Sequence, residues 1–435
     1  MNDTAWSQDL QIKVELGIGE SFDPWVGSTW GTALWGDPGA RWSGQEPAWV
    51  DVTCHFRTVE TSGGMDYTVG RFTTSSAQLV AENASGWAGL LLEQAMDIQV
   101  RRQVRVTALV MAGPSQGATV PLFLGYVDGI TPTYLAGGLP GVQLDCVDAL
   151  ALFAADDPLE LTTPVGGGEL TGARVGRILD RVGWPATRRD LAAGQVHVQA
   201  TNMARNYADE LGVTADTEGG ALFVSPAGLV TFRDRDWLRT TSGPSYTIGN
   251  TVGTDACPTS WVTGQSMGEI VSQVALANAG GTVRNYQDPT TFAEVGPATF
   301  RRFDLIAQDE SQLDVLAGRI LADRGQVTAR VRGTTLSLLG DPGWARALVV
   351  GVQYGTRILA TYEDPAGLDS FTFPTLVTRI AHRVDADGDW TLTLGLEDAA
   401  PYSLSPPWGV ARWAIDDWTS ATRAALRHRP EGAPA

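Results

Sequence analysis

Two long stretches of this 435-residue chain alternate apolar and polar residues, and a stretch with helical spacing separates them. The alternation is clearest at 50–56, 120–127 and 376–384. Successive side chains of a strand point to opposite faces, so this pattern predicts half-buried β-strands. The chain is therefore expected to be α+β and mainly β.

The first alternating stretch predicts one small β-domain over 49–155. Its strand candidates are separated by clusters of turn-forming residues, and they lie at 50–56, 72–80, 104–110, 120–127 and 142–147. Five short strands of this kind are typical of a barrel or a sandwich.

The middle stretch, 156–255, predicts an α+β domain. Thr171 can cap a helix that ends near Gly183, because apolar residues between them recur at three- and four-residue spacing. We expect a second helix over 201–211, ended by Gly212, and a hairpin over 222–232.

The second alternating stretch predicts another β-domain over 256–400. One helix is inserted near 309–324, where Asp309 and Gln312 form a capping-box pattern. Strands are expected to resume after it, including the apolar run 347–359 and a hairpin over 376–396. The fold predicted is two β-barrel-like domains with an α+β domain between them.

The two ends of the chain have a different character. Residues 1–48 are rich in tryptophan and glycine and predict an irregular arm, while 401–435 predict a short C-terminal extension. Four tryptophans of the arm could stack on sugars, but tryptophan is also enriched among residues that carry binding energy in protein interfaces. We favour an interface and keep glycan or receptor binding as the alternative for these residues: Trp25, Trp30, Trp35 and Trp42.

Charge and hydropathy limit the partners. A formal net charge of −18 disfavours binding to nucleic acid or to an anionic membrane. No run reaches the roughly 18 apolar residues of a membrane span, and the first ten residues do not resemble a signal peptide. We expect no membrane span and a cytoplasmic origin, with three reduced, buried cysteines: Cys54, Cys146 and Cys257.

The sequence contains one match to a catalytic motif and four histidines, but the neighbouring residues do not favour catalysis at any of them. Gly264 to Gly268 matches the nucleophile elbow G-x-S-x-G around Ser266, but the motif needs a helix after the serine and a strand pattern follows. The four histidines are scattered, which favours packing or surface roles over acid–base catalysis, and they are His55, His197, His382 and His428.

Candidate metal and phosphate motifs are better explained as turns. Asp385, Asp387 and Asp389 alternate as in a calcium loop, but Gly388 and Trp390 fit a hairpin turn. The glycines at 166–168 precede a helix without the G-K-S/T of a phosphate loop. We therefore expect no catalytic residue, no cofactor, no metal and no enzymatic activity.

Several short blocks resemble the minor tail proteins of actinobacterial siphophages. Blocks similar to the opening domain of that family lie at 49–53, 69–73, 77–83, 121–128 and 144–150. Blocks similar to its second tube domain lie at 267–274, 301–304 and 313–321. The resemblance covers about 49–400.

The resemblance implies a hub at the tip of a phage tail, similar to the baseplate hubs of contractile phages. Such a hub is a homotrimer whose two β-domains per copy alternate in a pseudo-sixfold ring. Its partners would be the distal tail ring, the tape-measure protein and tip or fibre proteins, and DNA would pass through it without specific binding. Its place would be the virion tail tip, after assembly in the host cytoplasm. We also hypothesise an acidic lumen that repels DNA.

Overall fold

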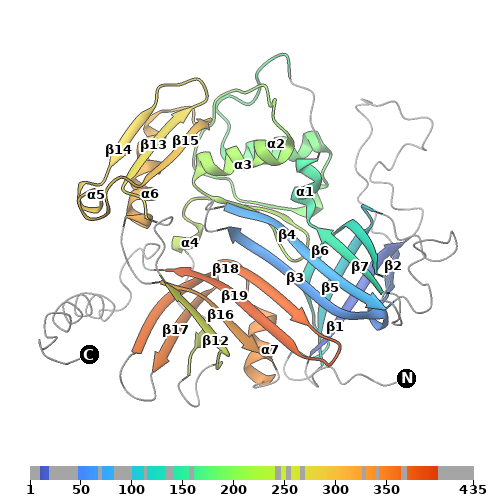
Figure 1. The fold of residues 1–435 in the computed structure, drawn as a ribbon. Coiled ribbons are helices and arrows are strands. Elements are labelled where there is room, and N and C mark those ends of the chain that lie inside the picture. The colour runs from blue at the N-terminus through green and yellow to red at the C-terminus, as the bar shows by residue number, and fades with distance from the viewer. Residues whose placement is uncertain are drawn as a thin grey trace, which may run out of the picture.

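The computed structural model is mainly β, and its largest element is one sheet of 13 strands (Figure 1). The strand path of this sheet runs from β12 to β2 and does not close into a barrel among the strands described. The structure describes residues 10–18, 48–66, 71–82, 100–111, 115–133, 141–155, 161–240, 246–250, 256–264, 270–325, 330–338, 342–363 and 370–399.

The N-terminal half of the sheet has the order β3-β4-β7-β6-β5-β1-β2, with every neighbouring pair antiparallel. The 3-10 turn η1 (Thr53–His55) links β2 to β3. The strands of this half are β1 (Leu10–Ile18), β2 (Ala48–Asp51), β3 (Phe56–Asp66), β4 (Arg71–Glu82), β5 (Gln103–Val110), β6 (Thr119–Thr133) and β7 (Gly141–Val147).

The C-terminal half repeats this order as β12-β16-β19-β18-β17-β11. Counted along the chain from β3 and from β12, the first, second, fifth, fourth and third strands follow one another in the sheet in both halves. The last pair differs, since β11 is parallel to β17 whereas β1 is antiparallel to β5. The strands are β11 (Tyr246–Ile248), β12 (Ser260–Gly264), β16 (Arg330–Ser337), β17 (Arg357–Glu363), β18 (Ser370–Val384) and β19 (Trp390–Asp398).

One core fills the space on the covered face of both halves. Apolar residues of the two halves belong to a single buried cluster, to which Leu348 and Val349 of helix α7 (Pro342–Gly351) also contribute. The two β regions of the sequence are therefore joined by one sheet and one core. The predicted domain bounds themselves stay predictions.

An α+β unit packs against the β3 and β4 side of the sheet (Figure 1). It has its own core around Phe232 and Leu211 and a small sheet of order β8-β10-β9. Its elements are α1 (Ala149–Ala154), α2 (Thr171–Val182), η2 (Ala186–Arg188), β8 (Arg189–Leu191), α3 (Tyr207–Glu218), β9 (Ala221–Val224), β10 (Val230–Arg233) and α4 (Trp237–Thr240).

A second small unit is inserted between β12 and β16. Its sheet has the order β14-β13-β15, and helix α6 covers one face through Leu313 and Leu316. Its elements are β13 (Gln273–Asn278), β14 (Arg284–Gln287), α5 (Pro289–Val295), β15 (Thr299–Leu305) and α6 (Ser311–Arg324). The helix expected at 309–324 is thus present, but the strands before it form a separate sheet instead of part of the second β-domain.

Three local predictions are wrong. The irregular arm predicted for 1–48 contains β1, whose alternating Leu10–Ile18 lies between β2 and β5 in the sheet. The second helix of the middle unit begins later, because Asn206 caps it and Gly219, with φ 68°, ends it. The apolar run 347–359 begins as helix α7, which has a proline in its first turn, where the missing N–H costs nothing.

Candidate assembly interface

The two halves of the sheet meet along one pair of strands, β3 and β18. Strand β18 pairs with β19 along one edge, while its other edge pairs first with β17 and then with β3. Six residue pairs join β18 to β3, from Arg379 with Gly64 to Val384 with Val59. We call residues 59–64 and 379–384 the seam. It is a half-to-half contact made by backbone pairing.

Glycine allows the seam strands to approach. Gly64 has φ 143°, and a Cβ at this position would collide with the carbonyl oxygen of Thr378. A Cβ at Gly63 would meet the side chains of Ser75 and Tyr354. Both positions therefore require the absence of a side chain, which places these two glycines among the residues that form the interface.

On its covered face the seam buries a histidine. The His382 side chain, 7 % exposed, lies opposite Thr61, and Trp390 Nε1 donates a hydrogen bond to His382 Nδ1 over 3.3 Å. Burial lowers the pKa of His382 to about 4. The imidazole is neutral at neutral pH and acts as an acceptor in the core.

A buried carboxyl lies close to the seam on the N-terminal half. Asp148 accepts hydrogen bonds from the backbone N–H of Ser75 (2.6 Å) and of Leu150 (2.9 Å), and so caps α1. Burial raises the pKa of Asp148 to about 6 against these hydrogen bonds, which lower it. Asp148 therefore ties α1 to β4.

We expect His382 and Asp148 to respond to acid with opposite signs. The folded pKa of His382 is depressed from 6.5, so its contribution to stability is present above pH 6.5 and is lost as pH falls to 4. The folded pKa of Asp148 is raised from 3.8, so its contribution is full below pH 3.8 and is lost as pH rises through 6. Each contribution is about 3 kcal/mol.

Thermal unfolding of two variants at pH 4.5 and 7.5 tests these signs. The quantity to follow is the Tm of the variant minus the Tm of the wild type at the same pH. From pH 7.5 to pH 4.5 this difference should rise for His382→Gln and fall for Asp148→Asn. Because the other carboxylates are present in all three proteins, the effect of their protonation on Tm cancels in this difference. Parallel pH profiles for the three proteins would show that neither buried group titrates as argued.

Four aromatic rings mark the place where the units meet. Phe223 of β9 lies 4.7 Å from Phe72 of β4, 5.8 Å from Trp237 and 5.1 Å from Tyr354, as distances between ring centroids. These rings come from the N-terminal half, the α+β unit and the C-terminal half. The cluster fixes the α+β unit over the seam.

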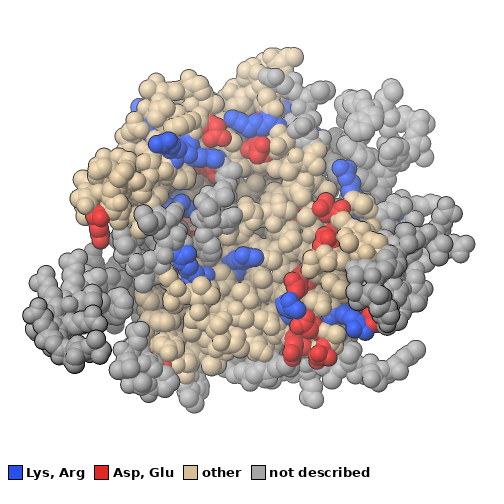
Figure 2. Space-filling model, in the orientation of Figure 1, with Lys and Arg blue, Asp and Glu red and all other residues tan. Residues whose placement is uncertain are grey.

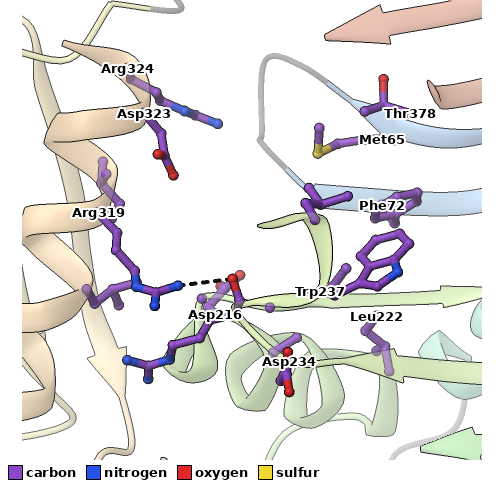
Figure 3. Close-up of a pocket in the computed structure, with 18 of the residues that line it drawn as sticks. Met65, Phe72, Asp216, Leu222, Asp234, Trp237, Arg319, Asp323, Arg324 and Thr378 are labelled. Atoms are coloured by element: carbon purple, nitrogen blue, oxygen red, sulfur yellow. Dashed lines mark hydrogen bonds between the residues drawn. The ribbon is translucent and has the colours of Figure 1, made fainter. Parts of the chain in front are cut away.

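A cavity of about 410 Å³ lies beside this aromatic cluster (Figure 3). Arg319, Asp323 and Arg324 of α6 face it from one side, and Phe72 and Trp237 from the other.

Ion pairs between units line the same region. Arg302 of β15 pairs with Asp216 of α3, and Arg319 with Asp236 at 2.7 Å. These contacts hold the inserted unit against the α+β unit, which is a structural explanation for the charges there.

The other face of the large sheet is bare of a second layer in the described structure. Its residues form cross-strand rows, and one row of small residues runs through Ser260, Thr335, Thr393, Ala381, Ser62 and Ser76. Figure 2 shows a broad area of this face without charged side chains, beside a patch where both signs gather.

The charged side chains of the seam rows on this face have polar partners. Arg383 contacts Glu60 at 2.7 Å across the seam, Arg379 donates to Ser62 Oγ, and Asp145 accepts from Gln78 and Gln143. The carboxylate excess of the chain is therefore not concentrated in these seam rows.

The residues singled out in the sequence do not come together. The four tryptophans Trp25, Trp30, Trp35 and Trp42 lie outside the described residues, as do Ser266 and His428. His55 lies in the turn before β3, and His197 Nδ1 contacts the carbonyl oxygen of Gly168 in the α+β unit. Strand β13 follows the serine motif, as the alternation predicts.

The acidic and glycine-rich motifs are structural. Asp385 and Asp389 close the predicted β18–β19 turn through backbone hydrogen bonds, with Gly388 at φ 83°. The backbone around Gly166 accepts hydrogen bonds from the fully buried Arg174. Within the described ranges no group of three His, Cys, Asp or Glu could hold a metal ion, and no helix is long and apolar enough to span a membrane.

The prediction of three buried cysteines is wrong for two of them. Cys54 and Cys257 are exposed, and only Cys146 is buried. Both exposed cysteines lie just before corresponding strands, β3 and β12. The seam residues were not identified as functional from the sequence, because nothing local in 59–64 or 379–384 marks them as partners.

Two solved structures share this fold. The tail protein from Neisseria meningitidis MC58 aligns with a TM-score of 0.57 and 11 % identity, over 90 % of this chain and 96 % of that one. The 43 kDa tail protein of prophage MuSo2 from Shewanella oneidensis aligns with a TM-score of 0.53 and 12 % identity, over 90 % and 99 %. No family model matches the sequence, and no curated protein matches it significantly.

Proposed function

We propose that the protein is a structural component of a bacteriophage tail tip, a homotrimeric hub ring that joins the distal tail ring to tip or fibre proteins. The repetition of one strand order in two halves of a single sheet carries this proposal. Three copies present six similar halves, so one ring can match a sixfold tail on one side and a threefold tip on the other. The shared fold of the two tail proteins supports the same conclusion.

The bare face of the sheet would line the channel of such a ring. Its other face packs on the buried core and on α7, which would lie outside the channel wall, where a ring has the larger circumference. The wall would then be rich in serine and threonine, with Arg383 paired to Glu60 and with Arg379 and Asp145 hydrogen-bonded to neutral side chains. A wall of this kind lets DNA pass because it offers few free charges to a phosphate, which replaces our hypothesis of an acidic lumen.

The remaining partners follow from this place in the tail. The distal tail ring and the tip or fibre proteins would contact opposite rims, and the tape-measure protein would occupy the channel before ejection. The proposed function consists of binding these partners, and no enzymatic step is proposed. The protein would act in the virion tail tip after assembly in the host cytoplasm.

The proposed function predicts a trimer with a central channel. Mass photometry of the purified protein should give a species of three times the 46.3 kDa of one chain, and negative-stain images should show a ring. Oligomers form by mass action, so the measurement needs a concentration series. A protein that stays monomeric at tens of micromolar in sedimentation velocity and binds cell-wall polysaccharide would contradict the hub and favour a glycan-binding module.

A further inference from the structure

We infer that copies of this chain join edge to edge, through β6 of one copy and β12 of the next, and that this contact repeats the seam found inside each copy. The inference rests on the proposed hub function and names the surfaces that close the ring. The two halves of the sheet correspond strand by strand, and their edges show where the next copy fits.

Strands β6 and β18 correspond in length, partners and irregularity. Each has 15 residues, and each pairs through its first part with the preceding strand, β5 or β17. The pairing of β6 with β7 shifts register between Val127 and Gly129, and that of β18 with β19 between Val377 and Arg379. Gly129 therefore corresponds to Arg379, and the residues after them correspond one to one.

The corresponding edges are used differently. After its register shift β18 pairs with β3 in the seam, whereas residues 129–133 of β6 have no strand on that edge in the described structure. The strand that corresponds to β3 is β12, which pairs with β16 on one edge and ends the strand path. Val262 of β12 is 54 % exposed. An edge strand with free backbone groups is a template for pairing with another chain.

The partner of β6 must come from another copy. Within one copy β12 and β6 are separated by the intervening strands β16, β19, β18, β3, β4 and β7. A contact between two different surfaces of identical chains is head-to-tail, and such contacts close into a ring when the rotation allows it. The seam is already one contact of this kind, because it joins the N-terminal half to the C-terminal half through different strands, β3 and β18.

The rows of the sheet give the register. One row runs through Gly129, Asp145, Gln78 and Glu60, and the corresponding row runs through Arg379, Gly395, Gly333 and Val262. Val262 therefore corresponds to Glu60, and Gly264 to Ser62.

The seam then fixes the contact between copies. Inside one copy Ala381 pairs with Ser62, and Thr131 corresponds to Ala381. Thr131 of one copy should therefore lie opposite Gly264 of the next.

A second free edge provides a matched control. Strand β2 is the other end of the path, and its Val50 is also exposed. Among the described strands, none of the C-terminal half corresponds to β2, because the strand path of that half ends at β11. The seam therefore predicts no role for β2 in joining copies.

Disulfide trapping tests this pairing. In a chain with Cys54→Ser and Cys257→Ser, Thr131→Cys and Gly264→Cys are introduced together. Thr131 is exposed, and a Cβ at Gly264 has Arg332 Nε as its nearest atom at 3.9 Å, so both positions accept a side chain. The native Cys146 is buried and its thiol pKa is raised, which keeps it unreactive. Oxidised glutathione accepts the two electrons as the two thiols form one disulfide.

The expected product is a covalent trimer on non-reducing gels, at least ten times more abundant than covalent oligomer from either single variant. Mixing the two single variants before assembly should give covalent dimers and no covalent trimer, since each copy then has one introduced thiol. The Val50→Cys, Gly264→Cys pair should give no covalent trimer.

The outcomes separate the two proposals. A trimer by mass that is trapped through position 50 and not through 131 would overturn the β6–β12 contact while leaving the hub function standing. A protein that never trimerises would overturn the hub function itself. Trapping through 131 with a trimeric mass supports both.

Discussion

Replacing Glu218 by alanine should lower the free energy of unfolding of the α+β unit by about 3–5 kcal/mol. Glu218 is fully buried at the C-terminal end of α3. It accepts hydrogen bonds from Thr171 Oγ1 (2.7 Å) and from the backbone N–H of Val196 (3.0 Å), and it pairs with the buried Arg235. Alanine leaves the guanidinium charge of Arg235 in the interior without its directly paired carboxylate.

Two controls make this result specific. Glu218→Gln keeps an acceptor for the hydroxyl and the N–H but removes the negative charge, so its loss should be smaller than that of alanine. Glu310→Ala removes an exposed ion-pair partner of Arg284, and solvent-exposed pairs of this kind contribute little to stability. The measurement is chemical denaturation followed by tryptophan fluorescence. Equal losses for Glu218→Ala and Glu310→Ala would show that the buried pair does not hold the unit together.

Replacing Phe223 by alanine should have an effect of similar size, about 3–5 kcal/mol, for a different reason. Its ring is buried and contacts Phe72, Trp237 and Tyr354, so the truncation opens a cavity where three parts of the chain meet. Rings from separate units cannot all move inward to fill it. We expect the α+β unit to loosen from the sheet.

Limited proteolysis gives the second readout for this variant. Cleavage between the sheet and the α+β unit should become at least tenfold faster in Phe223→Ala, while Phe223→Leu, which keeps most of the apolar volume, should stay near the wild-type rate. If both variants melt like the wild type and resist protease equally, the aromatic cluster does not fix the units.

Local patterns in the sequence predicted much of the secondary structure. The hairpin of β18 and β19, helix α2 and the helix now seen as α6 follow from alternation, capping and turn residues close in sequence. The sequence pattern does not predict strand β1, because its alternating Leu10–Ile18 adjoins a glycine- and tryptophan-rich segment that predicts an irregular arm.

The candidate interface could not be predicted in this way. Strands β3 and β18 pair although more than 300 residues separate Thr61 from His382, and neither strand carries a local signal for its partner. His382 was interpreted as one of four scattered histidines, and only the packed structure shows that it lies in the joint. The shared strand order of the two halves likewise depends on pairing, which alternation alone does not specify.

The inserted unit leaves and re-enters the large sheet at one point, because Gly264 at the end of β12 is the register partner of Arg330 at the start of β16. In the N-terminal half the corresponding strands, β3 and β4, are joined by the short segment 67–70. The insertion is therefore an elaborated hairpin loop between two paired strands. Such a loop can be lengthened, shortened or replaced without altering the register of the two strands that carry it.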